Sequence, residues 1–282
     1  MTEPFPNVSD ALFSLNGQVV VITGAAGLLG REHCEAVAGA GGTPVLLDLH
    51  PQAVEQQVAN ITKRFGGSAS GWAVDITREA EIEVNCAALL ARYGRIDALI
   101  NNAANNPKVE ANAGNNFSRL EHFPLDVWQA DLAVGLTGSF LCAKHYGAAI
   151  ARNPQGGSIV NISSDLGLIG PDQRLYRRLN LPDDQQPVKP VTYSVVKTGL
   201  IGLTRYLATY WADRNVRCNA ICLGGVENKQ DNEFLEEVTR RIPLGRLARA
   251  DEYRGLLIFL LSDAASYLNG AVIAADGGRT AW

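Results

Sequence analysis

A short apolar segment that runs into a glycine turn, close to the start of the chain, restricts the possible folds most strongly. Residues 19–22 are Val-Val-Val-Ile, with no polar residue among them. Such a β-branched run is typical of a strand buried on both faces, as in a parallel sheet. Thr23 and Gly24 end the run, and the Ala-rich residues 28–40 have helical spacing. The predicted strand, turn and helix would aim backbone N–H groups at a phosphate, although small residues at such a turn can also serve packing alone.

An acidic residue at the end of the next predicted strand favours a dinucleotide site. Residues 43–47 form a second β-rich run, and Asp48 follows it directly. A carboxylate in this place accepts hydrogen bonds from both hydroxyls of the adenosine ribose and repels a 2′-phosphate. No Arg or Lys follows within three residues, and the turn carries Gly27 where a basic residue could hold that phosphate. The sequence predicts NAD rather than NADP; the alternative is that Asp48 only caps a helix starting near Pro51.

The third predicted strand, residues 68–74, also ends at an acidic residue. Asp75 is followed by Ile76, and its carboxylate is placed to accept a hydrogen bond from the amino group of adenine. Asp75 would equally suit the N-cap of the predicted helix 78–93, so both roles stay open.

The remaining apolar runs complete the fold prediction. Further strands are expected at residues 96–100, 158–162, 216–222 and 271–275, with helical patterns between them. Alternating strands and helices predict an α/β fold with a doubly wound, Rossmann-type parallel sheet of about seven strands and helices on both faces. We expect a lead-in over residues 1–16 and a single catalytic domain over 17–282.

Composition excludes several other classes of protein. The 282 residues are 46% hydrophobic and 19% charged, and the net charge of −4 argues against a nucleic-acid surface. The five cysteines form no CxxC pair, which fits buried thiols in a reducing compartment, and no metal site is predicted. No run of about 18 apolar residues and no signal-peptide pattern occurs. These features predict a cytoplasmic enzyme with no membrane partner.

Four motifs, taken in order, resemble the short-chain dehydrogenase/reductase family, in its compact one-domain branch. They are the glycine turn at 23–30, Asn-Asn-Ala at 101–103, Tyr-x-x-x-Lys from Tyr193 to Lys197, and Asp-Gly-Gly at 276–278. Four ordered motifs are far more specific than one glycine turn. The resemblance implies that Ser164, Tyr193 and Lys197 are catalytic. It also implies contacts with NAD from Thr23, Gly24, Gly27, Leu28, Leu29, Gly30, Asp48, Asp75, Ile76, Asn102, Ala103, Lys197 and Val226.

The Tyr-x-x-x-Lys pair has a clear chemical use. Tyr193 and Lys197 are four residues apart, so on a helix their side chains share a face. An ammonium group ~5 Å from the phenol, at an effective dielectric of ~20, would favour phenolate by roughly 3 kcal/mol, or about two pKa units. We therefore expect Tyr193 to exchange a proton with a substrate hydroxyl that Ser164 holds, while Lys197 also binds the nicotinamide ribose.

Three residues depart from the family pattern. Gly135 aligns with a catalytic asparagine that supports a proton-relay water, and it offers no side chain for that role. Leu28 stands where the compact branch has glycine, and Leu223 replaces the proline of a Pro-Gly pair after the sixth strand. Gly135 and Leu223 keep open an alternative class, a non-catalytic dinucleotide-binding sensor or assembly partner.

An enlarged segment at residues 168–191 separates Ser164 from Tyr193. Its arginines predict that it recognises an anionic group of the substrate, and the Asn-rich loop from Asn105 to Pro124 adds candidate contacts. The opposing possibility is that nearby aspartates neutralise the arginines in surface ion pairs. The candidate substrate residues are Asn105, Arg174, Arg177 and Arg178.

The predicted function is NAD-dependent transfer of hydride between nicotinamide and a secondary alcohol or ketone of a polar substrate, sugar-like or anionic. The pattern around Ser164 and Tyr193 is loosely similar to a subset of the family associated with surface-glycan sugar biosynthesis. Apolar residues on more than one face of the predicted helix 193–212, Leu200, Ile201, Leu203, Leu207 and Trp211, predict a helix buried on both sides. Together with the family resemblance, they predict a homodimer or homotetramer.

Overall fold

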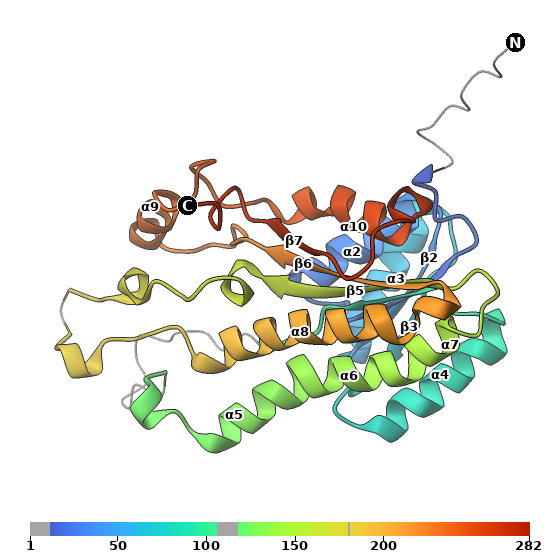
Figure 1. Ribbon diagram of the computed structural model, residues 1–282, viewed down its shortest axis with the longest axis horizontal. Helices are drawn as coiled ribbons and strands as arrows, with labels where there is room; N and C mark the ends of the chain where they lie inside the picture. Colours follow the sequence, from blue (N-terminus) through green and yellow to red (C-terminus); the bar gives the residue numbers. More distant parts are fainter. Residues whose placement is uncertain (1–11, 106–117, 180) are drawn as a thin grey trace, which may run out of the picture.

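The apolar run near the start of the chain forms an inner strand of a seven-stranded parallel sheet (Figure 1). The computed structural model describes residues 12–105, 118–179 and 181–282. The strand order is β3-β2-β1-β4-β5-β6-β7, and every neighbouring pair is parallel. The strands are β1 (Val19–Thr23), β2 (Thr43–Asp48), β3 (Ser70–Ala73), β4 (Ala98–Asn101), β5 (Gly157–Ser164), β6 (Val216–Leu223) and β7 (Val272–Ala275).

Helices cover both faces of the sheet, as a doubly wound fold requires (Figure 1). Alternate residues of β1 face opposite layers: Val19 and Val21 pack in one apolar core, and Val20 and Ile22 pack in the other. The first core is closed by α4 (Glu79–Tyr93), α6 (Ser139–Cys142), α7 (Ala148–Ile150) and α8 (Val191–Tyr210). The second is closed by α2 (Leu28–Gly39), α3 (Pro51–Phe65) and α10 (Arg254–Leu261). The predicted fold class is confirmed.

The chain reverses direction across the sheet between β1 and β4. From β1 it winds outward through β2 and β3, then crosses to β4 on the other side of β1 and continues to β7. Where neighbouring connections diverge in this way, the carboxyl ends of the strands border a crevice suited to a ligand. The predicted site residues follow the carboxyl ends of these strands.

The long helix predicted over residues 125–152 contains two wider turns that its apolar spacing did not reveal. It begins as α5 (Leu125–Leu132), passes through a π-helical segment Ala133–Gly138 into α6, and through a second, Ala143–Gly147, into α7. Gly135, at the position of the family asparagine, lies in the first of these segments and is buried. Among the helices of the described residues, none combines the length and the apolarity needed to cross a membrane.

The enlarged segment between β5 and α8 contains short 3₁₀ turns at Gln173–Tyr176 and Asp183–Gln185. Leu175 of the first turn packs in a small apolar cluster with residues that include Val238 of α9 (Asn232–Thr239). The segment is thereby joined to α9, although about 60 residues of chain separate the two.

Candidate active site

A cavity of about 580 Å³ lies at the carboxyl ends of the strands. Its lining comes from the turns after β1 to β6 and from α8, α9 and the segment that follows β7. Twelve of the thirteen predicted cofactor residues line this cavity, and all three predicted catalytic residues do. The exception is Thr23. A second hollow of about 620 Å³, beside Arg152, Trp211 and Arg214, contains none of the predicted site residues.

The glycine turn is held so closely that two of its positions require glycine. Gly24 has a φ of +63°, and a β-carbon there would lie 2.9 Å from Cα of Ala103. A β-carbon on Gly30 would lie 2.1 Å from the carbonyl oxygen of Gly24. The first turn of α2 faces the cavity, and no side chain caps its N-terminus at Gly27. Uncapped backbone N–H groups at a helix N-terminus fit the pyrophosphate of a dinucleotide.

Thr23 does not line the cavity but stabilises the glycine turn through hydrogen bonds. Its buried hydroxyl accepts hydrogen bonds from the backbone N–H of Asn102 at 3.0 Å and of Ala103 at 3.1 Å. The side-chain amide of Asn102 donates to the carbonyl oxygens of Thr23 at 2.9 Å and Gly24 at 3.1 Å. Thr23 and Asn102 thus fasten the end of β4 to the glycine turn.

The two acidic residues border the cavity and also brace their own turns. Asp48 accepts hydrogen bonds from the backbone N–H groups of Ala26 at 3.0 Å and Leu49 at 2.8 Å. It does not cap α3, whose N-cap is His50. Asp75 accepts from both the backbone and the hydroxyl of Thr77, at 2.9 and 2.7 Å, and the N-cap of α4 is Arg78. Simple helix capping therefore accounts for neither carboxylate.

The three predicted catalytic side chains meet at the other end of the cavity. Ser164 ends β5, and its hydroxyl donates to Oδ1 of Asp165 at 2.7 Å. Tyr193 and Lys197 come from α8, and Nζ of Lys197 donates to the carbonyl oxygen of Ile162 at 2.8 Å. The neighbouring Ser163 instead donates to the backbone carbonyl of Lys197 at 2.7 Å and so fixes α8 against β5.

Burial dominates the electrostatics of this group. It raises the pKa of Tyr193, and a hydrogen bond with Ser164 opposes that rise. Burial also lowers the pKa of Lys197 to about 8, and the positive charge of Lys189 adds to the effect. The prediction that Lys197 lowers the Tyr193 pKa by about two units is wrong for this geometry, because burial penalises the phenolate and the Asp165 carboxylate repels it.

Comparison with known proteins identifies the family. Residues 18–176 match the family described as short chain dehydrogenase, and residues 185–280 match the one described as enoyl-(acyl carrier protein) reductase. The chain belongs to the short-chain dehydrogenase family.

Relatives of this short-chain dehydrogenase differ in their assigned substrates. A D-threitol dehydrogenase from Mycolicibacterium smegmatis is 31% identical over 95% of each chain. A gluconate 5-dehydrogenase from Burkholderia cenocepacia, solved in complex with NADP and tartrate, is 26% identical, with a TM-score of 0.81 over 97% of this chain and 99% of that one. An uncharacterized relative from Sinorhizobium fredii is 34% identical over 93% of this chain, which spans only 43% of its length. The loose resemblance to a glycan-biosynthesis subset is not supported.

The three predicted substrate arginines lie outside the lining of the cavity. Arg174 pairs with Asp172 at 2.8 Å and is 77% exposed, and Arg177 pairs with Asp183. Arg178 is exposed, and its backbone N–H donates to the side chain of Gln186 at 2.7 Å. For Arg174 and Arg177, this is the alternative in which aspartates neutralise the arginines at the surface.

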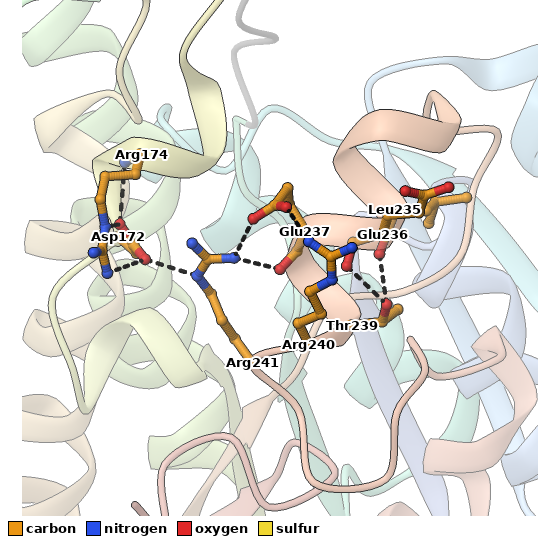
Figure 2. A network of polar contacts seen from close by, with 8 residues as sticks. All are labelled: Asp172, Arg174, Leu235, Glu236, Glu237, Thr239, Arg240 and Arg241. Carbon is orange, nitrogen blue, oxygen red and sulfur yellow. Dashed lines mark hydrogen bonds and ion pairs between the residues drawn. The ribbon is translucent and has the colours of Figure 1, made fainter.

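Figure 2 shows that the pair of Arg174 and Asp172 belongs to a larger network of ion pairs. Asp172 lies between Arg174 and Arg241 and contacts Arg241 at 2.7 Å. Arg241 also pairs with Glu237 of α9 at 3.0 Å. The enlarged segment is therefore tied to the end of α9, which lines the cavity through Phe234 and Val238. Asn105 does line the cavity, and residues 106–117 of its loop lie outside the described part of the chain.

Two basic residues that the sequence did not single out line the cavity in this short-chain dehydrogenase. Nζ of Lys189 lies 3.8 Å from the ring centroid of Tyr193. Arg279 forms a buried ion pair with Asp165 at 2.9 Å. Lys189 lies before Pro190, the N-cap of α8, so helical periodicity does not place it relative to Tyr193. Arg279 reaches the site only through the path of the chain after β7, for which the sequence carries no periodic signal.

Proposed function

We propose that this short-chain dehydrogenase uses NAD to interconvert a secondary hydroxyl and a ketone on a small, polar, polyhydroxylated substrate. The observation that carries the proposal is one cavity with Asp48 at one end and Ser164, Tyr193 and Lys197 at the other. The names of the threitol and gluconate relatives support a polyol or sugar acid as the substrate class.

The choice of NAD rests on Asp48. Its carboxylate borders the cavity at the carboxyl end of β2, where a 2′-phosphate on the adenosine ribose would meet a negative charge. The gluconate 5-dehydrogenase was solved with NADP, so family membership alone does not decide the cofactor. When bound, the dinucleotide supplies the hydride acceptor or donor.

The protein's own groups handle the oxygen and its proton. In the oxidative direction, the hydroxyl of Ser164 would hold the substrate oxygen, and Tyr193, as phenolate, would accept the proton of the substrate hydroxyl. The buried ammonium of Lys197 would stabilise that phenolate and bind the nicotinamide ribose. The non-catalytic alternative draws on Gly135, which removes the family's relay side chain. It is weakened because Ser164, Tyr193 and Lys197 all line one cavity.

The oligomer proposal now rests on different residues from those the sequence suggested. Leu200, Ile201 and Leu207 of α8 are buried against their own protomer, so they supply no interface. Tyr206 and Tyr210 remain 61% and 59% exposed, and their rings stack at 5.6 Å. An exposed aromatic pair of this kind supports self-association as a homodimer or homotetramer.

The direct test is a substrate panel with the purified chain. NADH formation is followed by its absorbance. The substrates are tetritols, pentitols, hexitols and their aldonic acids. We expect turnover with at least one of them and none with the Tyr193→Phe variant. NADH binding without turnover of any panel member would instead favour the non-catalytic class.

A further inference from the structure

A lysine from the enlarged segment lies against the tyrosine at the reacting end of the cavity. Nζ of Lys189 is 3.8 Å from the ring centroid of Tyr193, and Nζ of Lys197 is 5.8 Å from the same centroid. The phenolic oxygen lies at the rim of this ring. One small substrate can therefore reach both groups: an oxygen hydrogen-bonded to the Tyr193 hydroxyl would lie only a few covalent bonds from a substrate group that contacts Lys189.

The charges around Lys189 favour an anion at this place. Among the described lining residues near Tyr193, three are basic, Lys189, Lys197 and Arg279, and one is acidic, Asp165. The Asp165 carboxylate already pairs with Arg279 at 2.9 Å and accepts the Ser164 hydroxyl at 2.7 Å. Of the acidic residues, Asp48 ends β2 and Asp75 follows β3, and both lie toward the opposite edge of the sheet.

Burial strengthens the attraction of this lysine for an anion. Lys189 is largely removed from water, and this burial lowers its pKa to about 8. A desolvated ammonium gains more from a carboxylate partner than a solvated one does. Arg174 is exposed and shares Asp172 with Arg241.

We propose that Lys189 binds a carboxylate of the substrate, so that the substrate is a hydroxy acid with its carboxylate two or three bonds from the carbon that is oxidised. This inference rests on the proposed function, since it names the substrate class of the same site. It replaces the three arginines with one lysine as the residue that recognises the anion.

The test compares pairs of compounds that differ only in charge. Dissociation constants of gluconate and glucitol, and of 3-hydroxybutyrate and 1,3-butanediol, are measured by calorimetry on the NADH-saturated protein at pH 7. We expect at least one carboxylate to bind ten times more tightly than its neutral counterpart. Equal binding of both members in both pairs would overturn the proposal without any variant.

The variants then assign the effect to Lys189. Lys189→Gln should weaken binding of the preferred carboxylate at least tenfold and binding of the neutral compound less than twofold. Lys189→Arg should stay within threefold of the wild type. Arg174→Gln, a change in the same segment at an exposed position, should change neither. An unchanged carboxylate affinity in Lys189→Gln, or an equal loss in Arg174→Gln, would refute the assignment.

The two proposals fail separately. If polyols are oxidised in a Tyr193-dependent reaction but Lys189→Gln leaves the carboxylate preference intact, only the present inference is lost. If carboxylates bind through Lys189 but no hydroxy acid or polyol reduces NAD, the oxidoreductase proposal is lost and the binding site remains.

Discussion

Gly135 and Val196 pack so closely that a β-carbon on the glycine would lie 2.5 Å from Cγ1 of the valine. Gly135 belongs to the π-helical segment that follows α5, and Val196 precedes Lys197 on α8. Gly135 stands at the position of the family asparagine, and Val196 fills the space that a side chain there would occupy. An asparagine at this position would therefore require Val196 to move.

Restoring the asparagine should therefore harm this protein. We expect Gly135→Asn to lower the free energy of unfolding by about 1–3 kcal/mol, because the side chain must displace Val196. It should not raise kcat. Denaturant unfolding measures the effect, and Gly202→Ala is the control, since a β-carbon on this exposed α8 residue meets nothing within 4 Å. In the Gly135→Asn/Val196→Ala double variant, part of the loss should be recovered as a coupling energy.

Cofactor choice is expected to depend on Asp48. NADH should bind at least about tenfold more tightly than NADPH, a difference of ~1.4 kcal/mol, and Asp48→Ala should narrow this gap by relieving repulsion of the 2′-phosphate. Fluorescence titration with both cofactors measures it. Asp75→Ala is the matched control, because its loss should weaken both cofactors alike. Equal dissociation constants in the wild type would exclude a role for Asp48 in selection.

The proton-transfer role of Tyr193 predicts a separation of binding from turnover. Tyr193→Phe should abolish turnover of any accepted substrate and leave NADH binding nearly unchanged. Lys197→Ala should impair both, because the lysine serves phenol and ribose. Tyr206→Phe, on the exposed face of the same helix, should alter neither kcat nor NADH affinity if the tetramer or dimer is retained. Substantial residual activity of Tyr193→Phe would contradict the mechanism.

Carboxylate binding should weaken at alkaline pH. Burial lowers the Lys189 pKa to about 8, so its ammonium is present at pH 7 and is lost above pH 8. Asp165 opposes this shift, whereas Lys197 carries a similarly lowered pKa of about 8. Above pH 8 the affinity for a carboxylate should fall by up to about tenfold per pH unit, with little change for a neutral polyol. In Lys189→Arg the fall should shrink, since guanidinium stays charged.

Self-association should depend on the exposed tyrosines of α8. Light scattering at micromolar concentration is expected to give the mass of a dimer or tetramer. Tyr206→Ser/Tyr210→Ser should shift the mass toward the monomer, since it removes the stacked aromatic surface. Leu244→Ser, which alters a 67% exposed leucine outside α8, provides the comparison. A monomeric wild-type protein would end this proposal.

The sequence was sufficient to predict the sheet and to predict residues that line one cavity at its carboxyl edge. Val21 lies within β1 and Asp48 ends β2, so local pattern and topology together determine their positions. The sequence was insufficient for the pKa values of the site, because these depend on burial. Tyr193 and Lys197 share a helical face as expected, yet the direction of the Tyr193 pKa shift depends on how much water the surrounding elements exclude.

The sequence also failed to place side chains that belong to irregular segments. Lys189 and Arg279 reach the cavity along backbone without helical or strand periodicity, so neither pattern could place them. The arginines at 174 and 177 were visible as a charge cluster, but whether they face the substrate or their neighbouring aspartates depends on the 3₁₀ turn at Gln173–Tyr176.

The buried pair of Arg279 and Asp165 makes activity depend on whether the edge strand β7 stays in the sheet. β7 is short and not fully buried, and among the described strands it pairs with β6 alone, so its detachment is an inexpensive local opening. Detachment would withdraw Arg279 and leave the carboxylate beside Ser164 buried without its cation, a state that must rearrange. Sub-global fraying at this edge would therefore silence the enzyme while most of the fold persists, and in urea the loss of activity should precede the loss of helical circular dichroism.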